Sequence, residues 1–582
     1  MIKRIAIGLL AAVIALVPMM QSAKPVLAAP VRGDVDGDGA ITSTDARLVL
    51  QYSVGKVGES DLSTDLADVD GDNTITTTDA RLILQYSVGK IDAFPFDEAP
   101  VIGATVPFIT YEAESATLEN GAVVGQEYYR RQAASGKQYA ELGKVDSSVS
   151  FVATKAANRV TIRYSAPYRS TAVLEVLVNG QSVTLLTLNT VQCHGIREDG
   201  NRDSGVRRYT ESAVETLIKA GDTVTLINRR GDIAVDLVDM ETAPDPVAKP
   251  ENALSIVDFG ATPDDDTDDS DAIDACFQEA ARGRKWVYVP AGTFLQSRRI
   301  TIPAYVKFTG AGIWYSNIEF TTPGTTYSNT SGYSMSHSNV VSGIHFNDRV
   351  AHSRGDATIL FRPFGNYQMV EDCWFSNVGC VFGWDNVSGK NVFRNNRVIG
   401  TYFDATHWGD GRSAYNEMYE NYFRGIGDDA IAQVNREDMG LCEGNYAHHN
   451  TIVASYWGRG ISVVGGNDLI LRYNKVYGTY NAGLIITTEN LSPSKSRPIQ
   501  NILVEYNEFS LCGHTVYDDA SVTASNHATI HMALMTNPMY DVIIRHNILR
   551  NGDTKPIQLD RTEYDNSEAV FENNVTEGFG KK

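Results

Sequence analysis

Residues 395–400 read NNRVIG, and related segments return six more times along the last third of the chain. They are ENYFRG at 420–425, HNTIVA at 449–454, YNKVYG at 473–478, YNEFS at 506–510, HNILRN at 546–551 and NNVTEG at 573–578. The second residue is Asn every time, at 396, 421, 450, 474, 507, 547 and 574, so the steps are 25, 29, 24, 33, 40 and 27 residues. An Asn, a short apolar alternation and a turn predict one coil of a parallel β-solenoid per repeat, with stacked Asn side chains.

Two neighbouring coils carry candidate catalytic carboxylates, Asp404 and the pair Asp428–Asp429. Asp404 and Asp428 are 24 residues apart, which is one coil, so we expect them on the same face, about one strand spacing from each other. Glycoside hydrolysis needs one protonated carboxyl group and others that are ionised, and crowding of like charges keeps one protonated. On spacing alone, structural Asp residues at coil turns explain the pattern equally well.

The solenoid is expected to span residues 252–582, after the Pro-rich linker TAPDPVAKPEN. Its opening, SIVDFGATPDDDTDDSDAIDACFQEAA followed by KWVYVPAGTF, resembles the entrance of pectate-lyase-like right-handed β-helices. The acidic run 264–269 is interpreted as a loop that caps a helix beginning near Ser270, in preference to a metal site, because Asp and Ser satisfy free N–H groups at a helix start.

The segment IPAYVKFTGAGIWYS, the coil beginning at Asp404, the GDDAIA element and RGISVVGGNDLILRYNKV together resemble glycoside hydrolase family 87, the α-1,3-glucanases. The resemblance implies that Asp404, Asp428 and Asp429 are catalytic. By analogy, Asp428 would be the general acid and the other two would hold the attacking water, with inversion at the anomeric carbon. His407, Trp408 and Arg459 are candidates for contacting the sugar.

Several other residues are weaker candidates for the site. The family usually has a Gly-Ile/Val-Asn element after its first aspartate, whereas this chain reads DATHW at 404–408, so Asp410 is a rival to Asp404. His514 is a further candidate for the groove. Asp518 and Asp519 form a second acidic pair, but their flanks lack the glycine turn.

Residues 101–245 show short alternating strands, such as NRVTIRYSAP and DTVTLINRR, separated by turn signals, and this predicts a β-sandwich. The opening YEAE at 111–114, with Asp236 near the end, resembles carbohydrate-binding modules of families 6 and 35. The resemblance implies a calcium ion held by Glu112, Glu114 and Asp236. Sugar binding by this module is less firmly indicated, because the segment contains no Trp to stack on a sugar ring.

Residues 31–92 contain a 34-residue duplication, DVDGDGAITSTD at 34–45 and DVDGDNTITTTD at 68–79, each followed by a helical pattern. Carboxylates at loop positions 1, 3, 5 and 12 suit calcium. The expected ligands are Asp34, Asp36, Asp38 and Asp45 in the first copy and Asp68, Asp70, Asp72 and Asp79 in the second. The duplicated unit resembles a dockerin, which implies two calcium ions and a cohesin domain of a scaffoldin as partner. Ser43–Thr44 and Thr77–Thr78 would help to select the cohesin.

The N-terminus has the pattern of a signal peptide, residues 1–29. Lys3 and Arg4 precede a 13-residue apolar run, and small residues follow at Ala28 and Ala29. A retained anchor is the alternative, but the run is shorter than the about 20 residues that span a bilayer. The chain has 50 Lys and Arg against 71 Asp and Glu, a formal net charge of -21, which disfavours nucleic acid and anionic membranes as partners.

The sequence therefore predicts a mostly β protein. A right-handed parallel β-helix catalytic domain is preceded by a β-sandwich and a small α-helical dockerin with duplicated calcium loops. The expected function is that of a secreted glycoside hydrolase, attached to a cellulosome-like complex, that cleaves a polysaccharide, with α-1,3-glucan as the expected substrate. The alternatives are another β-helix enzyme, either a polygalacturonase or a polysaccharide lyase, and a non-catalytic carbohydrate-binding protein.

Overall fold

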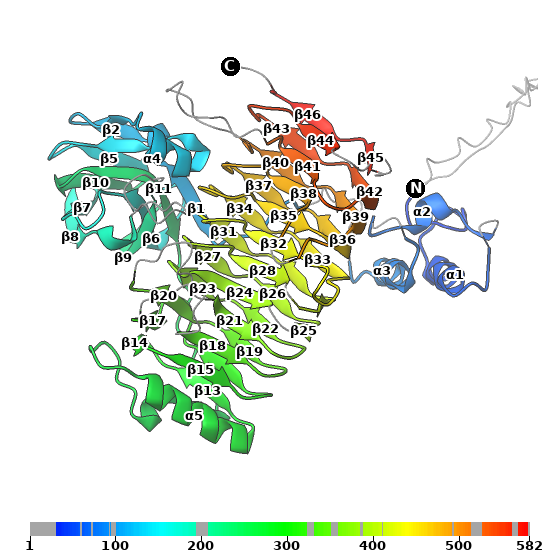
Figure 1. Cartoon of the computed structure of the whole chain (residues 1–582), viewed down its shortest axis with the longest axis horizontal. Helices are drawn as coiled ribbons and strands as arrows, with labels where there is room; N and C mark the ends of the chain where they lie inside the picture. The colour runs from blue at the N-terminus through cyan, green and yellow to red at the C-terminus, as the bar shows by residue number, and fades with distance from the viewer. Residues whose placement is uncertain are drawn as a thin grey trace, which may run out of the picture. The chain divides into compact units, whose positions relative to one another are not determined.

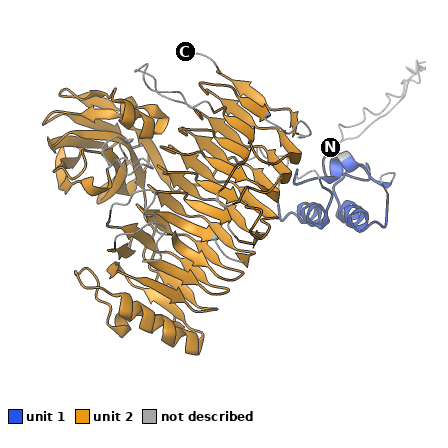
Figure 2. Cartoon of the chain, viewed as in Figure 1, with its two compact units in different colours: residues 1–100 blue, residues 101–582 orange. Residues whose placement is uncertain are grey.

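The computed structural model describes residues 31–579 apart from some short segments. The segments not described are 1–30, 59–60, 72–73, 92–93, 95–100, 194–207, 323–330, 351–358, 385–387, 410, 492–493, 514–526, 562–568 and 580–582. The expected signal peptide, Asp72, Asp410, His514 and the pair Asp518–Asp519 thus lie outside the described residues. Within the described part of the chain, no helix is long and apolar enough to cross a membrane. The chain divides into a first compact unit, 1–100, and a second, 101–582 (Figure 2).

The described part of the first unit contains three helices, of which the first and third follow the two acidic loops and the second lies between them. They are α1 (Ser43–Ser53), α2 (Thr64–Ala67) and α3 (Thr77–Ser87), with α1 packed against α3. Thr42 and Thr76 cap α1 and α3, and the side chains of Asp45 and Asp79 accept a hydrogen bond from the backbone N–H of the capping threonine. Val49 and Ile83, one from each copy, are fully buried in the shared core. The internal repeat therefore folds as two equivalent loop–helix units around one core.

The second unit begins with an antiparallel β-sandwich, as the alternation predicts. One sheet contains β1 (Phe108–Glu112), β3 (Val123–Val124), β4 (Ala140–Leu142), β6 (Ala157–Ser165), β9 (Thr210–Ile218) and β11 (Ile233–Glu241). The other contains β2 (Thr117–Glu119), β5 (Ser148–Val152), β7 (Val173–Val178), β8 (Gln181–Thr187) and β10 (Thr223–Arg230). A short helix, α4 (Tyr128–Ala133), lies between β3 and β4.

Residues 253–577 form three parallel sheets that wind as a β-helix (Figure 1). The first sheet contains β12 (Ala253–Ser255), β13 (Trp286–Val289), β16 (Lys307–Gly310), β19 (Val340–Ser342), β22 (Met369–Glu371), β26 (Val392–Arg394), β30 (Glu417–Tyr419), β33 (Asn445–His448), β36 (Gly466–Arg472), β39 (Ile499–Glu505), β42 (Met539–Arg545) and β45 (Ala569–Glu572). The second contains β14 (Gly292–Gln296), β17 (Ser316–Phe320), β20 (His345–Asp348), β23 (Trp374–Ser376), β27 (Arg397–Ile399), β31 (Tyr422–Arg424), β34 (Thr451–Val453), β37 (Lys475–Tyr477), β40 (Glu508–Ser510), β43 (Ile548–Arg550) and β46 (Val575–Glu577). The third contains β15 (Arg299–Ile302), β18 (Gly332–Met335), β21 (Ile359–Pro363), β24 (Cys380–Trp384), β28 (Thr406–Gly409), β32 (Ile431–Val434), β35 (Ile461–Val464), β38 (Leu484–Thr488), β41 (Ile530–Leu534) and β44 (Ile557–Arg561). A small pair, β25 (Ser388–Gly389) and β29 (Ser413–Ala414), lies beside them.

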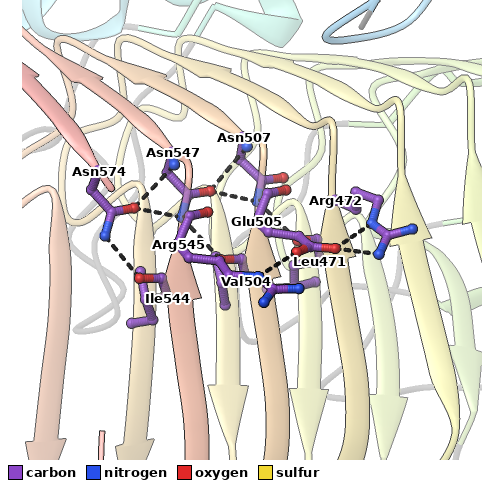
Figure 3. Close-up of polar contacts among 9 residues, drawn as sticks. All are labelled: Leu471, Arg472, Val504, Glu505, Asn507, Ile544, Arg545, Asn547 and Asn574. Atoms are coloured by element: carbon purple, nitrogen blue, oxygen red, sulfur yellow. Dashed lines mark hydrogen bonds and ion pairs between the residues drawn. The ribbon is translucent and has the colours of Figure 1, made fainter. Parts of the chain in front are cut away.

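The predicted Asn ladder is present at the turn between the first and second sheets (Figure 3). Each Asn donates its backbone N–H and its side-chain amide to the carboxamide oxygen of the next Asn, at 2.9 and 3.0 Å for Asn507 and Asn547. The same amide also donates to a backbone carbonyl of a preceding coil, as Asn574 does to Ile544 at 2.8 Å. The ladder satisfies buried backbone groups at a turn where strand pairing is interrupted. It therefore fixes the register of successive coils.

The entrance of the β-helix is closed by helix α5 (Ser270–Gly283), whose Phe277 and Cys276 are fully buried. The acidic run before it hydrogen-bonds the surrounding loop. Asp268 accepts from the backbone and hydroxyl of Ser270, and Asp269 accepts from Thr262 and Leu295. Asp268 thus accepts from the first helical N–H, as predicted for a capping loop, whereas Asp269 at the N-cap position makes no side-chain capping bond.

The sandwich packs directly on the second sheet of the β-helix. Arg397 pairs with Glu241 at 2.8 Å, and Arg424 pairs with Asp239 and with Glu211 at 2.6 Å. Phe108 packs edge-on against Tyr422, with ring centroids 5.1 Å apart. The buried ion pairs and apolar contacts make the two regions one body.

Candidate active site

The candidate catalytic residues lie on adjacent turns between the second and third sheets. Asp404 precedes β28, and Asp428 and Asp429 precede β32, the neighbouring strand. The two turns are joined by a hydrogen bond from Ala405 N–H to the Asp429 carbonyl at 2.9 Å. The one-coil spacing thus brings the carboxylates together as expected.

Two glycines permit this close stacking of turns. A Cβ atom on Gly427 would lie 2.6 Å from the backbone of Tyr402, and one on Gly458 would lie 2.3 Å from the backbone of Asp428. Both distances are shorter than any real Cβ contact, so a larger residue would push the turns apart. The glycine in the GDD element therefore has a steric role beside the carboxylates.

The three aspartates form a compact buried cluster. One carboxylate oxygen from each lies within 4.8 Å of the others, and the residues are only 5%, 2% and 5% exposed for Asp404, Asp428 and Asp429. Burial of several carboxylates is unfavourable unless donors and cations compensate them. The surrounding side chains supply both.

Arg459 provides the compensating positive charge. Its backbone N–H donates to Asp429 at 2.9 Å, and its guanidinium lies 3.3 Å from Asp429 and 3.8 Å from Asp428. The same guanidinium reaches Glu489 at 3.5 Å. These carboxylates, Asp429 foremost, hold the pKa of Arg459 above its ordinary value, so the residue stays charged. The sequence prediction gave Arg459 a sugar-contacting role, whereas the structure places it as the counter-charge of the aspartates.

The side chains of His407 and Trp408 point in different directions. His407 Nδ1 lies 2.8 Å from Asp404 Oδ2, so this side chain faces the carboxylate cluster. Trp408 is 1% exposed and belongs to the core of the β-helix. The prediction that Trp408 lines a sugar subsite is therefore wrong. Consecutive residues of a strand point to opposite faces, and only His407 of this pair can face the site.

Two residues near the site were missed by sequence reasoning. Glu489 follows β38 and contacts Arg459, and burial raises its pKa. His527 precedes β41, and burial lowers its pKa to about 4, with smaller electrostatic effects from His531, Arg459 and Asp429. Both belong to coils of irregular length, 33 and 40 residues between ladder positions, so no constant spacing pointed to them.

Three predicted calcium ligands from each acidic loop lie close together. Asp34, Asp36 and Asp38 form one oxygen cluster, and Asp68, Asp70 and Asp79 form another. Asp45 accepts from the backbone of Val35 at 2.9 Å and of Thr42 at 2.8 Å.

Two of the predicted ligands in the sandwich, Glu112 and Asp236, are linked through Ser135. Ser135 donates its backbone N–H to Asp236 at 2.9 Å and its hydroxyl to Glu112 at 2.8 Å. Burial, followed by the nearby Asp236 carboxylate, raises the pKa of Glu112 to about 8. Glu114 lies in a 3-10 turn after β1, whereas Glu112 is the last residue of the strand. Asp236 also pairs with the buried Arg163.

Comparisons with known proteins bear on each region. Residues 32–86 match the model of the dockerin type I domain, and residues 105–243 match that of the α-1,3-glucanase catalytic domain D1. Residues 253–485 match the rhamnogalacturonase A/epimerase, pectate lyase-like model. This chain is a dockerin-bearing glycoside hydrolase. None of the curated proteins matches the chain.

Solved structures share the fold of this glycoside hydrolase at low sequence identity. The Agl-KA catalytic domain is 19% identical with a TM-score of 0.67, over 83% of this chain and 98% of that one. The catalytic unit of a thermostable α-1,3-glucanase of family GH87 from Streptomyces thermodiastaticus strain HF3-3 is 22% identical with a TM-score of 0.67, over 82% and 92%. A GH87 α-1,3-glucanase catalytic domain in complex with nigerose is 18% identical with a TM-score of 0.66, over 82% and 96%. The sandwich and β-helix of this hydrolase therefore share the fold of these catalytic domains.

Proposed function

We propose that this glycoside hydrolase cleaves α-1,3-glucan with Asp404, Asp428 and Asp429. The observation that carries the proposal is the cluster of three buried carboxylates within 4.8 Å, held by one guanidinium. Three carboxylates beside one fixed positive charge favour retention of one proton, which provides a general acid. The match of residues 105–243 to an α-1,3-glucanase domain supports the substrate.

The hydrogen bonds around the carboxylates support the proposed roles. Asp429 accepts from the Arg459 backbone and side chain, and Asp404 accepts from His407 and from the Asp429 N–H at 3.2 Å. A carboxylate has more acceptor sites than these donors occupy, so each of the two residues can also accept from the attacking water and orient it. Asp428 is the acid. Attack by water in one step gives inversion.

The distance between the catalytic carboxyl groups bears on whether the anomeric configuration is inverted or retained. Carboxyl groups of inverting enzymes are typically about 6.5–9.5 Å apart, and those of retaining enzymes about 5–5.5 Å apart. One oxygen of each aspartate lies within 4.8 Å of the others, whereas these ranges refer to the separation of whole carboxyl groups. Proton NMR of the first product formed from an α-1,3-glucan oligosaccharide distinguishes the anomers, and an α-anomer as first product would exclude inversion.

Product analysis tests the activity itself. The wild-type chain, Asp428→Asn and Asp438→Asn are incubated with insoluble α-1,3-glucan and, in parallel, with polygalacturonate. Asp438 is the matched control, since its side chain is 44% exposed and it lies outside the cluster. We expect new reducing ends from the glucan for wild type and the control, and none for Asp428→Asn. Release from polygalacturonate alone, or unsaturated products, would favour the polygalacturonase or lyase alternative.

We also propose that the dockerin binds two calcium ions and a cohesin, and that the enzyme is secreted and acts within a cellulosome-like complex. The dockerin match supports this assignment.

Glu112, Glu114 and Asp236 are proposed to hold a further calcium in the sandwich. Buried carboxylate oxygens of Glu112 and Glu114 that find no hydrogen-bond partner among the described residues support this proposal. Calorimetric titration of the chain from residue 101 onward, with Glu114→Gln as comparison, tests this last site.

A further inference from the structure

A cavity of about 340 Å³ lies between the sandwich and the second sheet of the β-helix, apart from the catalytic aspartates. Its wall includes Thr161 and Glu211 from the sandwich and Trp314, His345, Trp374 and Asn377 from the β-helix. Asn189 and Ala213, also in the wall, are exposed, so the cavity opens to solvent on the side of the sandwich. Its size falls within the range of ligand pockets, which starts at about 300 Å³.

Four polar atoms of the wall find no hydrogen-bond partner among the described residues. They are the indole Nε1 of Trp314, the indole Nε1 of Trp374, Glu211 Oε2 and Thr161 Oγ1. Trp374 is 4% exposed and Thr161 is 1% exposed. A buried polar group left unsatisfied costs about 1–3 kcal/mol, so four such groups around one cavity indicate that an occupant completes them.

The aromatic part of the wall is rigid. The His345 ring stacks on Trp374 with centroids 4.5 Å apart, and the Arg397 guanidinium lies 4.8 Å from the Trp374 ring centroid. His345 Nδ1 lies 3.0 Å from Asn317 Oδ1, and its Nε2 lies 2.9 Å from Ser376 Oγ. Burial lowers the pKa of His345 to about 3, so the ring is neutral. Because the amide oxygen can only accept, Nδ1 carries the proton and Nε2 accepts from Ser376.

The chemistry of the unsatisfied groups selects the occupant. Two indole N–H groups can only donate, and Glu211 Oε2 accepts, while the other oxygen of Glu211 is bound by Arg424 at 2.8 Å. An anion would be repelled by Glu211, and a metal cation would meet the indole donors and the Arg424 charge. A hydroxyl group both donates and accepts, so neighbouring hydroxyls of a neutral sugar match this wall.

We propose that this cavity is a second carbohydrate site that binds a neutral hexosyl unit of the glucan through the edges of Trp314 and Trp374, Glu211 and Thr161. The choice of an α-1,3-linked glucose unit rests on the proposed function. The site adjoins the catalytic turn, because Asn377 accepts from Arg208 at 3.2 Å and Arg208 also donates to the Gly400 carbonyl. Gly400 begins the turn that ends at Asp404.

Fluorine NMR on the full chain labelled with 5-fluorotryptophan tests the proposal. The chain has six Trp residues, and Trp→Phe variants assign the resonances. The inactive Asp428→Asn chain is titrated with an α-1,3-linked glucose disaccharide, with digalacturonate and with glycerol. We expect saturable shifts of the Trp314 and Trp374 resonances with the glucose disaccharide only. Loss of one hydrogen bond in Thr161→Val should weaken this binding about 5-fold, whereas Trp286→Phe, outside the cavity, should leave it unchanged.

The outcomes separate the two proposals. Unshifted Trp314 and Trp374 resonances, or equal shifts with glycerol, would overturn the second site even if the wild type hydrolyses the glucan. Saturable shifts in a chain whose wild type releases nothing from the glucan would support the cavity and overturn the proposed catalysis. Thermal unfolding of Thr161→Val shows whether the variant retains its fold, and Trp314→Phe provides an independent loss of one donor.

Discussion

The dockerin loop and the active site each contain three aspartates whose oxygens lie within 4.8 Å of one another, yet their surroundings differ. In the loop, Asp36 and Asp38 are exposed, and the hydrogen bonds recorded there come from backbone N–H groups, such as Gly39 to Asp34 at 2.9 Å. In the active site all three are buried, and the Arg459 guanidinium lies among them. The same residue type at the same spacing thus occurs in two electrostatic environments.

The comparison shows which features determine whether a carboxylate cluster is suited to metal binding or to proton transfer. An exposed loop with oxygen ligands and no resident cation suits an incoming hard cation. A buried cluster with its own guanidinium is already partly neutralised, and a divalent cation there would compete with Arg459. The loop is therefore suited to calcium and the buried cluster to proton transfer.

The largest expected effects come from exchanging Asp for Asn in each cluster. Asp404→Asn should lower the rate of glucan hydrolysis about 10³-fold, the middle of the range for a residue that assists proton transfer, and leave cohesin affinity unchanged. Asp45→Asn should abolish cohesin binding and leave hydrolysis of a soluble oligosaccharide unchanged. Both variants are assayed for reducing ends and by calorimetric titration with a cohesin. A variant that loses both activities would show that the two clusters are not independent.

Calcium removal should act on the proposed calcium sites and not on the catalytic aspartates. Chelation with EGTA should lower the helical circular dichroism of the isolated segment 31–92, because metal binding contributes to the folding free energy of such loops. It should leave the catalytic rate of Glu114→Gln, which lacks the sandwich carboxylate, unchanged. A rate that falls on chelation in this background would place a metal at Asp404, Asp428 and Asp429.

Replacing Arg459 with Met removes the resident charge from the buried cluster. We expect a loss of about 10²-fold in kcat, as when one preorganised electrostatic contact is removed. The pH optimum should move upward, because the three carboxylates then hold protons more strongly without the guanidinium. The pH–rate profile measures this shift. An unchanged optimum would mean that Arg459 does not control protonation of the cluster.

Much of this fold was predictable from sequence because the relevant interactions are periodic. Asn396 to Asn574 recur once per coil, and the structure stacks them in one ladder. The Asp404–Asp428 spacing predicted their neighbourhood for the same reason. The alternation of strands also predicted the sandwich, although not its packing on the β-helix, since pairs such as Arg397–Glu241 join residues 156 positions apart.

The other features of the active site could not be predicted from the sequence. They depend on which face of a strand each side chain occupies and on coils of irregular length. Nothing in the letters DATHW shows that His407 faces Asp404 while Trp408 enters the core. Glu489 lies 30 residues after Arg459, in a coil whose length departs from its neighbours. The Trp314–Trp374 cavity is formed by two domains, so neither segment alone indicates it.

His407 offers a smaller test within the active site. His407→Gln retains a donor for Asp404 but loses the imidazole, and we expect a loss of about 10-fold in kcat with little change in KM, as for a residue that orients a catalytic group. His407→Ala should cost more, because the Asp404 oxygen then loses its 2.8 Å partner. Equal effects on KM would instead indicate direct contact with the sugar.

The smallest expected effect is on protein stability and not on the reaction. It concerns His345, at the interface between the sandwich and the β-helix. Burial lowers the pKa of His345 to about 3, below the about 6.5 of an exposed histidine, so the native state prefers the neutral ring. Its contribution to stability is complete above about pH 6.5 and is lost as the pH falls toward 3, because the unfolded chain binds the proton more readily. Thermal unfolding of the wild type and of His345→Gln between pH 7 and pH 4 isolates this contribution. The difference in unfolding temperature between the wild type and His345→Gln should shrink as the pH falls. A constant difference would mean that His345 binds a proton as readily in the folded chain as in the unfolded chain.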